Sequence, residues 1–162
     1  MPPPPIRELR DLTRYRLQQV RDRAQEVNRL CKVLEDAGLK LTTVITDVMG
    51  VSGRAMLRAL VEGTTDPVVL ADLARGKLRQ RIPDLQRALQ GRFRAHHAFL
   101  LQQILTTIDF LDETVARVTG EIDRRLAPFA ERAVRRHVRQ LEALGFHVTI
   151  EKVAQLKARQ IF

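Results

Sequence analysis

The sequence predicts an all-α fold: a long antiparallel helical hairpin of the coiled-coil kind, a cap of short helices, and a short C-terminal helix–strand remnant. Apolar residues recur at alternating spacings of three and four in two long stretches, which is the heptad pattern of paired helices. Glycine and proline divide the region between these stretches into short pieces. Aromatic residues are only 4% of the 162 residues, with no Trp and one Tyr, and coiled coils use few large rings.

The chain begins with Met1–Pro5, of sequence MPPPP. Proline has no backbone N–H and favours the extended polyproline II conformation, so residues 1–5 are expected to form a stiff linker. This start is typical of a linker whose preceding domain is missing. The helical coiled-coil region is expected to cover residues 6–128, and the C-terminal remnant residues 129–162.

The first long helix is expected over Ile6–Ala37, because Gly38 is a favoured residue just past a helix end. Its single cysteine, Cys31, rules out an internal disulfide and is expected to be a small core thiol. One apolar stripe of this helix is expected to pack against the second long helix. The stripe consists of Thr13, Leu17, Val20, Ala24, Val27, Cys31 and Leu34.

Short helices are expected between Leu39 and Gly91, where the punctuation is strong. An Asp-Pro pair is a helix cap followed by proline in the first turn, where its missing N–H costs nothing. The expected pieces are Thr42–Met49, a helix that begins at Ser52 or Gly53 and runs to Glu62, a helix begun by Asp66-Pro67 and ended by Gly76, and a helix begun by Ile82-Pro83 and ended by Gly91.

The second long helix is expected over Arg94–Leu126 and to end before Pro128. Its apolar seam is the expected dimerisation surface, and it consists of Leu101, Ile104, Ile108, Leu111, Val115, Val118 and Ile122. Leu100, Leu105, Phe110 and Leu126 widen this stripe, and a second chain is expected to cover the surplus. A further amphipathic helix is expected over Glu131–Leu144, followed by a strand at Phe146–Ile150.

The formal net charge is +9, and arginine far outnumbers lysine. This excess indicates a polyanionic partner, either nucleic acid or an acidic membrane; an arginine-rich genome composition explains it as well. The basic stretch between Arg75 and Arg94 contains one acid, Asp84, and is interpreted either as a solvated surface or as a phosphate-binding patch. The candidate nucleic-acid-binding residues are Arg75, Lys77, Arg79, Arg81, Arg92 and Arg94, with Arg7, Arg10 and Arg14 on the first helix.

The motifs of common catalytic and metal sites are absent from the sequence. His96 and His97 are adjacent, so their side chains are expected to point about 100° apart on a helix, which is unfavourable for chelating one metal. The acids Asp109, Asp112 and Glu113 are interpreted as a solvated helix face. No catalytic residue, metal, cofactor or small-molecule substrate is therefore expected. The sequence contains neither a signal peptide nor an apolar run near the roughly 18 residues of a membrane span, so a cytoplasmic protein without a membrane partner is expected.

Several stretches resemble the insertion-sequence 110 family, the DEDD-type, bridge-RNA-guided transposases of bacterial mobile elements. The resemblance covers about residues 2–128 and, in a second piece, the stretch from Ala133 to Phe146. The matching stretches are Arg7–Arg14, Val27–Leu30, Val33–Glu35, Asp47–Leu57, Gly91–Phe93 with His96-His97, and Ile108–Asp112.

The resemblance implies a fragment of such a transposase, truncated before Met1 and internally deleted near Phe129–Arg132. No position matches the acidic tetrad or the catalytic serine of the family, so a catalytically inactive chain is expected. The family resemblance further implies dimerisation, as a homodimer or a mixed dimer with full-length transposase, and contact with bridge RNA or DNA. The alternative function is a structural or interaction coiled coil without a nucleic-acid role.

Overall fold

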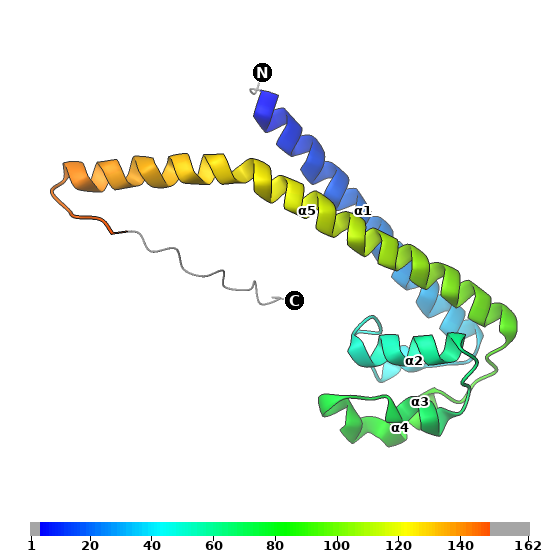
Figure 1. Cartoon of the computed structure of the whole chain (residues 1–162). Helices are drawn as coiled ribbons and strands as arrows, with labels where there is room; N and C mark the ends of the chain where they lie inside the picture. The colour runs from blue at the N-terminus through cyan, green and yellow to red at the C-terminus, as the bar shows by residue number, and fades with distance from the viewer. Residues whose placement is uncertain (1–3, 150–162) are drawn as a thin grey trace. The chain divides into compact units, whose positions relative to one another are not determined.

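The computed structural model describes residues 4–149, and the chain divides into two compact units, the first ending at Gly120 and the second beginning at Glu121. The described residues are mostly helical and include no strand, which confirms the predicted all-α class (Figure 1). The rest of the predicted linker and of the predicted C-terminal remnant, residues 1–3 and 150–162, lies outside the described residues. Pro4 and Pro5 belong to the first helix instead of to an extended linker, because proline is tolerated in the first turn of a helix.

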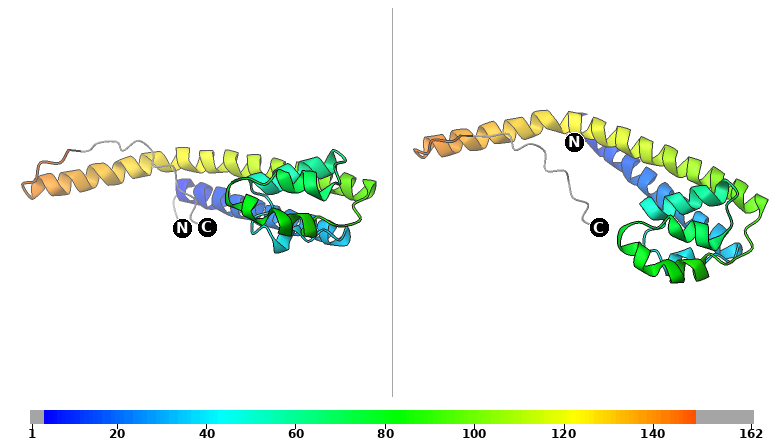
Figure 2. Two further views of the ribbon diagram at one scale, coloured as in Figure 1. Left: turned by 90° about the horizontal axis from the view of Figure 1, so that it is seen from below. Right: turned by 60° about the horizontal axis from the view of Figure 1, so that its bottom comes forward.

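Two long helices with short helices between them make up the first unit. The elements are α1 (Pro4–Asp36), η1 (Leu41–Thr43), α2 (Val51–Val61), α3 (Pro67–Asp72), η2 (Gly76–Arg81), α4 (Ile82–Ala88) and the first part of α5 (Ala95–Ala143). The short helices α2, α3 and α4 gather where α1 ends and α5 begins (Figures 1 and 2). Their hydrophobic side chains join those of the two long helices in one core.

The fully buried side chains of this core come from the C-terminal part of α1, from η1, α2, α3 and α4, and from the first part of α5. They include Leu30, Leu34, Leu41, Met56, Leu57, Leu60, Leu70, Leu85, Leu101 and Ile108. Two backbone hydrogen bonds join segments distant in sequence: the Lys40 N–H donates to the Ala88 carbonyl at 2.8 Å, and the Arg92 N–H donates to the Ala37 carbonyl at 2.7 Å. The segments after α1 and after α4 are therefore held together at the core.

The short helices agree with the sequence where the signal is local. Asp66 caps α3 as predicted, its Oδ1 accepting the Val68 N–H at 2.8 Å. The helix predicted over Thr42–Met49 is wrong, because only η1 and turns are present there. Asp47 Oδ1 accepts the Met49 N–H at 2.9 Å, and such side-chain bonds compete with helical ones.

Glycine does not end the two short helices at the predicted places. Helix α3 ends at Asp72, four residues before Gly76, and α4 ends at Ala88, three residues before Gly91. Gly76 instead adopts a φ of 59° and opens η2. Glycine adopts this left-handed conformation without steric cost. Gly76 therefore marks a change of direction in the chain, but it begins η2 and does not end α3.

The predicted stripe on α1 is only partly buried. Leu34 is buried and Val27 and Cys31 are half-buried, but the other four members, Thr13, Leu17, Val20 and Ala24, are exposed. The expected packing of those four residues against α5 is therefore wrong. Burial raises the pKa of the Cys31 thiol above its usual value, and the nearby Glu35 carboxylate raises it further.

A polar face of α1 contacts α5 in place of that stripe. Arg16 Nε donates to Thr119 Oγ1 at 2.7 Å, and Arg23 forms an ion pair with Asp112. Heptad spacing is present on both sides of α1, since Leu12, Arg16, Gln19 and Arg23 are half-buried with the same alternation of three and four. The stripe that faces α5 is therefore this mostly polar one, and not the more apolar stripe predicted from the sequence.

In the second unit, α5 continues through Pro128 to Ala143. The predicted helix end before Pro128, and with it a separate helix over Glu131–Leu144, is wrong. Proline removes the N–H that would bond to the Arg124 carbonyl, but the helical bonds on both sides remain available. The described part of the predicted strand, Phe146–Thr149, carries no strand, and Ile150 lies outside the described residues.

Candidate nucleic-acid interface

Three of the candidate nucleic-acid-binding residues lie around one open pocket of about 680 Å³. Arg75, Lys77 and Arg81 line it together with the start of α2, from Gly50 to Gly53. No side chain caps the N-terminus of α2, so the positive end of the helix dipole adds to the three cations. Asp47 is the one acid in the lining. The pocket therefore favours an anion.

A second pocket of about 350 Å³ adjoins the first, because Arg81 and Val44 line both. It adds two further cations, Lys40 and Arg87, and one acid, Asp84. We call the five basic residues of the two pockets the basic cap surface. Its members are Lys40, Arg75, Lys77, Arg81 and Arg87.

Asp84, the acid of the second pocket, pairs with two of the five cations, Arg81 and Arg87. Asp84 accepts hydrogen bonds from Arg87 at 2.5 Å and from Arg81 at 3.3 Å. Arg87 first and Arg81 second lower the pKa of the Asp84 carboxyl, so Asp84 stays charged. Among residues 4–149, none of the ion pairs involves Lys40, Arg75 or Lys77.

Local bonds hold the surface in place. The Arg75 N–H donates to Ser52 Oγ at 3.0 Å, which ties the start of η2 to α2. Arg81 Nη1 donates to the Val44 carbonyl at 2.9 Å. The hydrogen bond from the Lys40 N–H to the Ala88 carbonyl holds Lys40 beside α4 and so beside the other residues of this surface. Sequence analysis missed Lys40 because it is isolated in the sequence and joins the others only through that contact.

The other candidate residues lie outside the basic cap surface. Arg79 turns toward Asp72, with Nη2 at 3.1 Å from Oδ1. Arg92 and Arg94 are exposed in the connection between α4 and α5. The remaining three, Arg7, Arg10 and Arg14, are exposed on the N-terminal part of α1, away from α2, α3 and α4 (Figure 2).

The structure brings His96 and His97 closer than their adjacency suggested, with ring centroids 3.8 Å apart and Asp36 beside them. His97 is buried, its Nδ1 accepts the Arg94 N–H at 3.1 Å, and its Nε2 lies 3.1 Å from Asp36 Oδ2. Because Nδ1 accepts, Nε2 carries the proton and donates to Asp36. Both nitrogens are used, so a metal ion would have to break one of these bonds. His97 therefore links the end of α1 to the start of α5.

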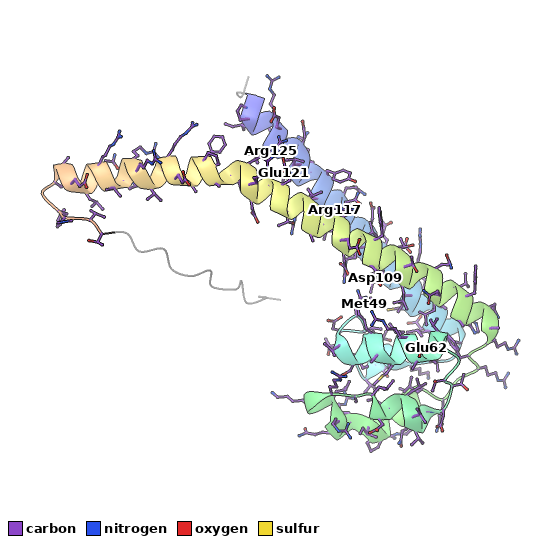
Figure 3. The ribbon with its side chains drawn as sticks, viewed as in Figure 1. Met49, Glu62, Asp109, Arg117, Glu121 and Arg125 are labelled. Carbon is purple, nitrogen blue, oxygen red and sulfur yellow. The ribbon has the colours of Figure 1, made fainter. Side chains whose placement is uncertain are left out.

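Two acids of α5, Asp109 and Asp112, form ion pairs that connect helices of the first unit. Arg54 of α2 reaches Asp109 and, at 3.1 Å, Asp112 Oδ2; it also donates to the Met49 carbonyl at 3.3 Å. Figure 3 labels Met49 and Asp109, two of the residues that Arg54 contacts. Since Arg23 also pairs with Asp112, one carboxylate joins α1, α2 and α5. Glu113 is exposed on the same helix.

The predicted dimerisation seam of α5 is largely covered by the chain itself. Leu101, Ile108 and Leu111 are buried, and the other four members, Ile104, Val115, Val118 and Ile122, are half-buried. Of the residues flanking the seam, Leu105 is buried, whereas Leu100 is 45% and Phe110 59% exposed. Pairing of the seam with a second chain stays a prediction, but the large side chains left uncovered lie beside it.

Within residues 4–149, no helix has both the length and the apolar character needed to cross a membrane. Comparison of the chain with known protein families, with curated proteins and with solved structures found no match.

Proposed function

We propose that this chain is a nucleic-acid-binding helical module, a non-catalytic fragment related to the insertion-sequence 110 transposases. The single observation that carries the proposal is the basic cap surface. Lys40, Arg75 and Lys77 have no acidic partner among the described residues, and they lie beside Arg81 in two adjoining pockets.

Phosphate groups suit the cations of this surface. Guanidinium groups bind phosphate oxygens with two parallel hydrogen bonds, and each neutralised phosphate releases a condensed counterion, which favours binding at low salt. The pockets are open and their cations are exposed, which suits contact with phosphates along a nucleic-acid backbone. The contacts would therefore be to the backbone and independent of sequence.

We further infer that α1 and the first part of α5 act as an antiparallel hairpin that presents this surface. The bonds from Arg16 to Thr119 and from Arg23 to Asp112 support this arrangement. The chain forms a homodimer, or a mixed dimer with full-length transposase, through apolar side chains that the monomer leaves exposed. These include Leu17 at 47%, Val20 at 37%, Phe99 at 65% and Phe110 at 59% exposure.

The proposal assigns binding without catalysis. Asp109 and Asp112 are paired with arginines, and His97 uses both of its nitrogens within the fold. These groups stabilise the first unit. The resemblance likewise leaves no residue for the acidic tetrad or the serine, and the partner it implies is bridge RNA or DNA.

Fluorescence anisotropy with short RNA and DNA duplexes over a range of salt concentrations tests the proposal. The variant Lys40→Gln/Arg75→Gln/Lys77→Gln removes three cations that make no ion pair in the described structure. We expect weaker binding to both duplexes. We also expect the slope of log affinity against log salt to fall by roughly one per lost phosphate contact.

The matched control is Arg21→Gln/Arg29→Gln/Arg58→Gln, which removes the same charge from exposed positions outside the basic cap surface. Equal losses in both triple variants would mean that only net charge matters, and would contradict a specific surface. Absence of binding by the unaltered chain at low salt would favour the second candidate function, an interaction module without nucleic acid, which the exposed apolar residues support.

A further inference from the structure

Four arginines lie together on the part of α5 that belongs to the second unit. Arg132, Arg135, Arg136 and Arg139 line one open pocket of about 600 Å³, and all four are exposed. Spacings of three and four residues place side chains on one face of a helix. We call these four residues the arginine stripe.

The stripe is weakly neutralised. Arg135 lies 3.9 Å from Glu131 in a highly exposed pair, and such surface pairs contribute little. The Arg132 guanidinium stands 5.8 Å from the centre of the Phe129 ring. In the described part of the chain no carboxylate pairs with Arg132, Arg136 or Arg139. Earlier in the same helix, by contrast, Glu121 binds Arg124.

An exposed apolar face occupies the opposite side of the same helix. Val134 is 45% and Leu141 42% exposed, and at about 100° per residue both fall roughly opposite Arg132. A helix that lies on a membrane has a large apolar face with Trp, Phe or Leu, whereas this face carries Val134 and Leu141 and the Phe129 ring stands by Arg132 on the arginine side. A helix that lay on a duplex would point the stripe at the phosphates. The arrangement therefore favours nucleic acid.

We propose that the arginine stripe is a second phosphate-binding site, which takes the backbone of double-stranded nucleic acid. From Arg132 to Arg139 the helix rises by roughly 10 Å at about 1.5 Å per residue. A duplex presents one phosphate charge per about 1.7 Å of its axis, so several phosphates lie within reach. This site belongs to the second unit and goes beyond the function proposed for the basic cap surface.

Duplex binding by the full chain and the variant Arg132→Gln/Arg136→Gln/Arg139→Gln tests the site. Glutamine is a good helix former, and circular dichroism checks that the helix content is kept. At low salt we expect binding of RNA or DNA duplex to weaken about tenfold or more, with a lower salt slope. The Arg132→Lys/Arg136→Lys/Arg139→Lys variant keeps the charge and should keep the salt slope, with reduced affinity because the planar fork is lost.

The outcomes separate this site from the basic cap surface. If the glutamine variant of the stripe weakens binding no more than Arg21→Gln/Arg29→Gln/Arg58→Gln does, the stripe is not a binding site and the basic cap surface can still stand. If only the stripe variant loses binding, the stripe stands and the function proposed for the cap falls. If the unaltered chain binds anionic phosphatidylserine vesicles and the glutamine variant of the stripe does not, while both bind duplex equally, the stripe is a membrane-binding surface and the proposal is overturned.

Discussion

At the scale of single residues, Gly53 is required by a close approach within the first unit. A Cβ atom at this position would lie 2.0 Å from the Val48 carbonyl oxygen. That oxygen belongs to the backbone and cannot rotate away, so the first turn of α2 would have to shift. We expect Gly53→Ala to lower the free energy of unfolding by about 1–3 kcal/mol, measured by urea denaturation.

The matched control is Gly120→Ala. Gly120 lies within α5, and a Cβ atom there meets nothing within 4 Å. Alanine is favoured over glycine inside helices, so this variant should gain about 0.5–1 kcal/mol. A neutral result for Gly53→Ala beside a gain for Gly120→Ala would show that the contact with Val48 relaxes easily.

Sequence reasoning identified single residues where the physics is local. Asp66 caps α3 as predicted, because the bond from Val68 spans only two residues. Arg54 was not recognised, since its partners Asp109 and Asp112 lie more than fifty residues away. The role of His97 was not predicted for the same reason, because its partner Asp36 is on the other long helix. Contacts of this kind appear only once the chain is folded.

At the scale of elements, one turn of α5 carries an acid with a strongly shifted pKa. Hydrogen bonds from Arg124 first and Arg125 second lower the pKa of Glu121 from 4.5 to about 2; Figure 3 labels Glu121 and Arg125. A lowered pKa stabilises the folded helix above the unfolded value of 4.5, and this contribution is lost as the pH falls through 2. An NMR titration should therefore find the Glu121 carboxyl charged well below pH 4.5.

The variant Arg124→Gln/Arg125→Gln supplies the control for this titration. Removing both guanidinium donors should return the pKa of Glu121 toward the ordinary value of a glutamate, near 4.3. The helical signal of the unaltered chain should change between pH 4.5 and 2 more than that of Glu121→Gln. A Glu121 midpoint near the ordinary value in the unaltered chain would contradict the hydrogen-bonded turn.

The long helices were predictable because periodicity extends over many residues. The seam of α5 is buried or half-buried at every predicted position. The predicted burial of the α1 stripe is wrong at Leu17 and Val20. A heptad pattern shows which residues are apolar, but it does not show which surface covers them. The helix end predicted before Pro128 is wrong because proline inside a helix costs about 3 kcal/mol, and the helical hydrogen bonds on both sides of Pro128 offset this cost.

At the scale of the whole molecule, the basic cap surface was half visible in the sequence. The arginine-rich stretch between Arg75 and Arg94 marked the region, but the fold brings only part of it together. Arg79 turns to Asp72, while Lys40 joins through its backbone bond to Ala88. Net charge favours an anionic partner, whereas the members of a surface depend on the tertiary fold.

The exposed apolar stripe of α1 leads to a prediction about assembly. Leu17 and Val20 are exposed at heptad spacing, while a polar face of the same helix contacts α5 through Arg16 and Arg23. A second copy of the chain could bury this stripe, and burial of apolar area is the main driving force of association. We expect the chain to be dimeric in analytical ultracentrifugation.

Two variants then distinguish the α1 stripe from the seam of α5. Leu17→Gln/Val20→Gln changes exposed side chains, so it should shift the chain toward the monomer. In solutions dilute enough for the unaltered chain to be monomeric, it should lower the free energy of unfolding by no more than about 0.5 kcal/mol per site. Leu101→Ala removes a fully buried side chain and should cost about 2–5 kcal/mol. If the dimer survives Leu17→Gln/Val20→Gln, the α1 stripe is not the interface, and Phe99→Gln/Phe110→Gln becomes the test of the exposed face of α5.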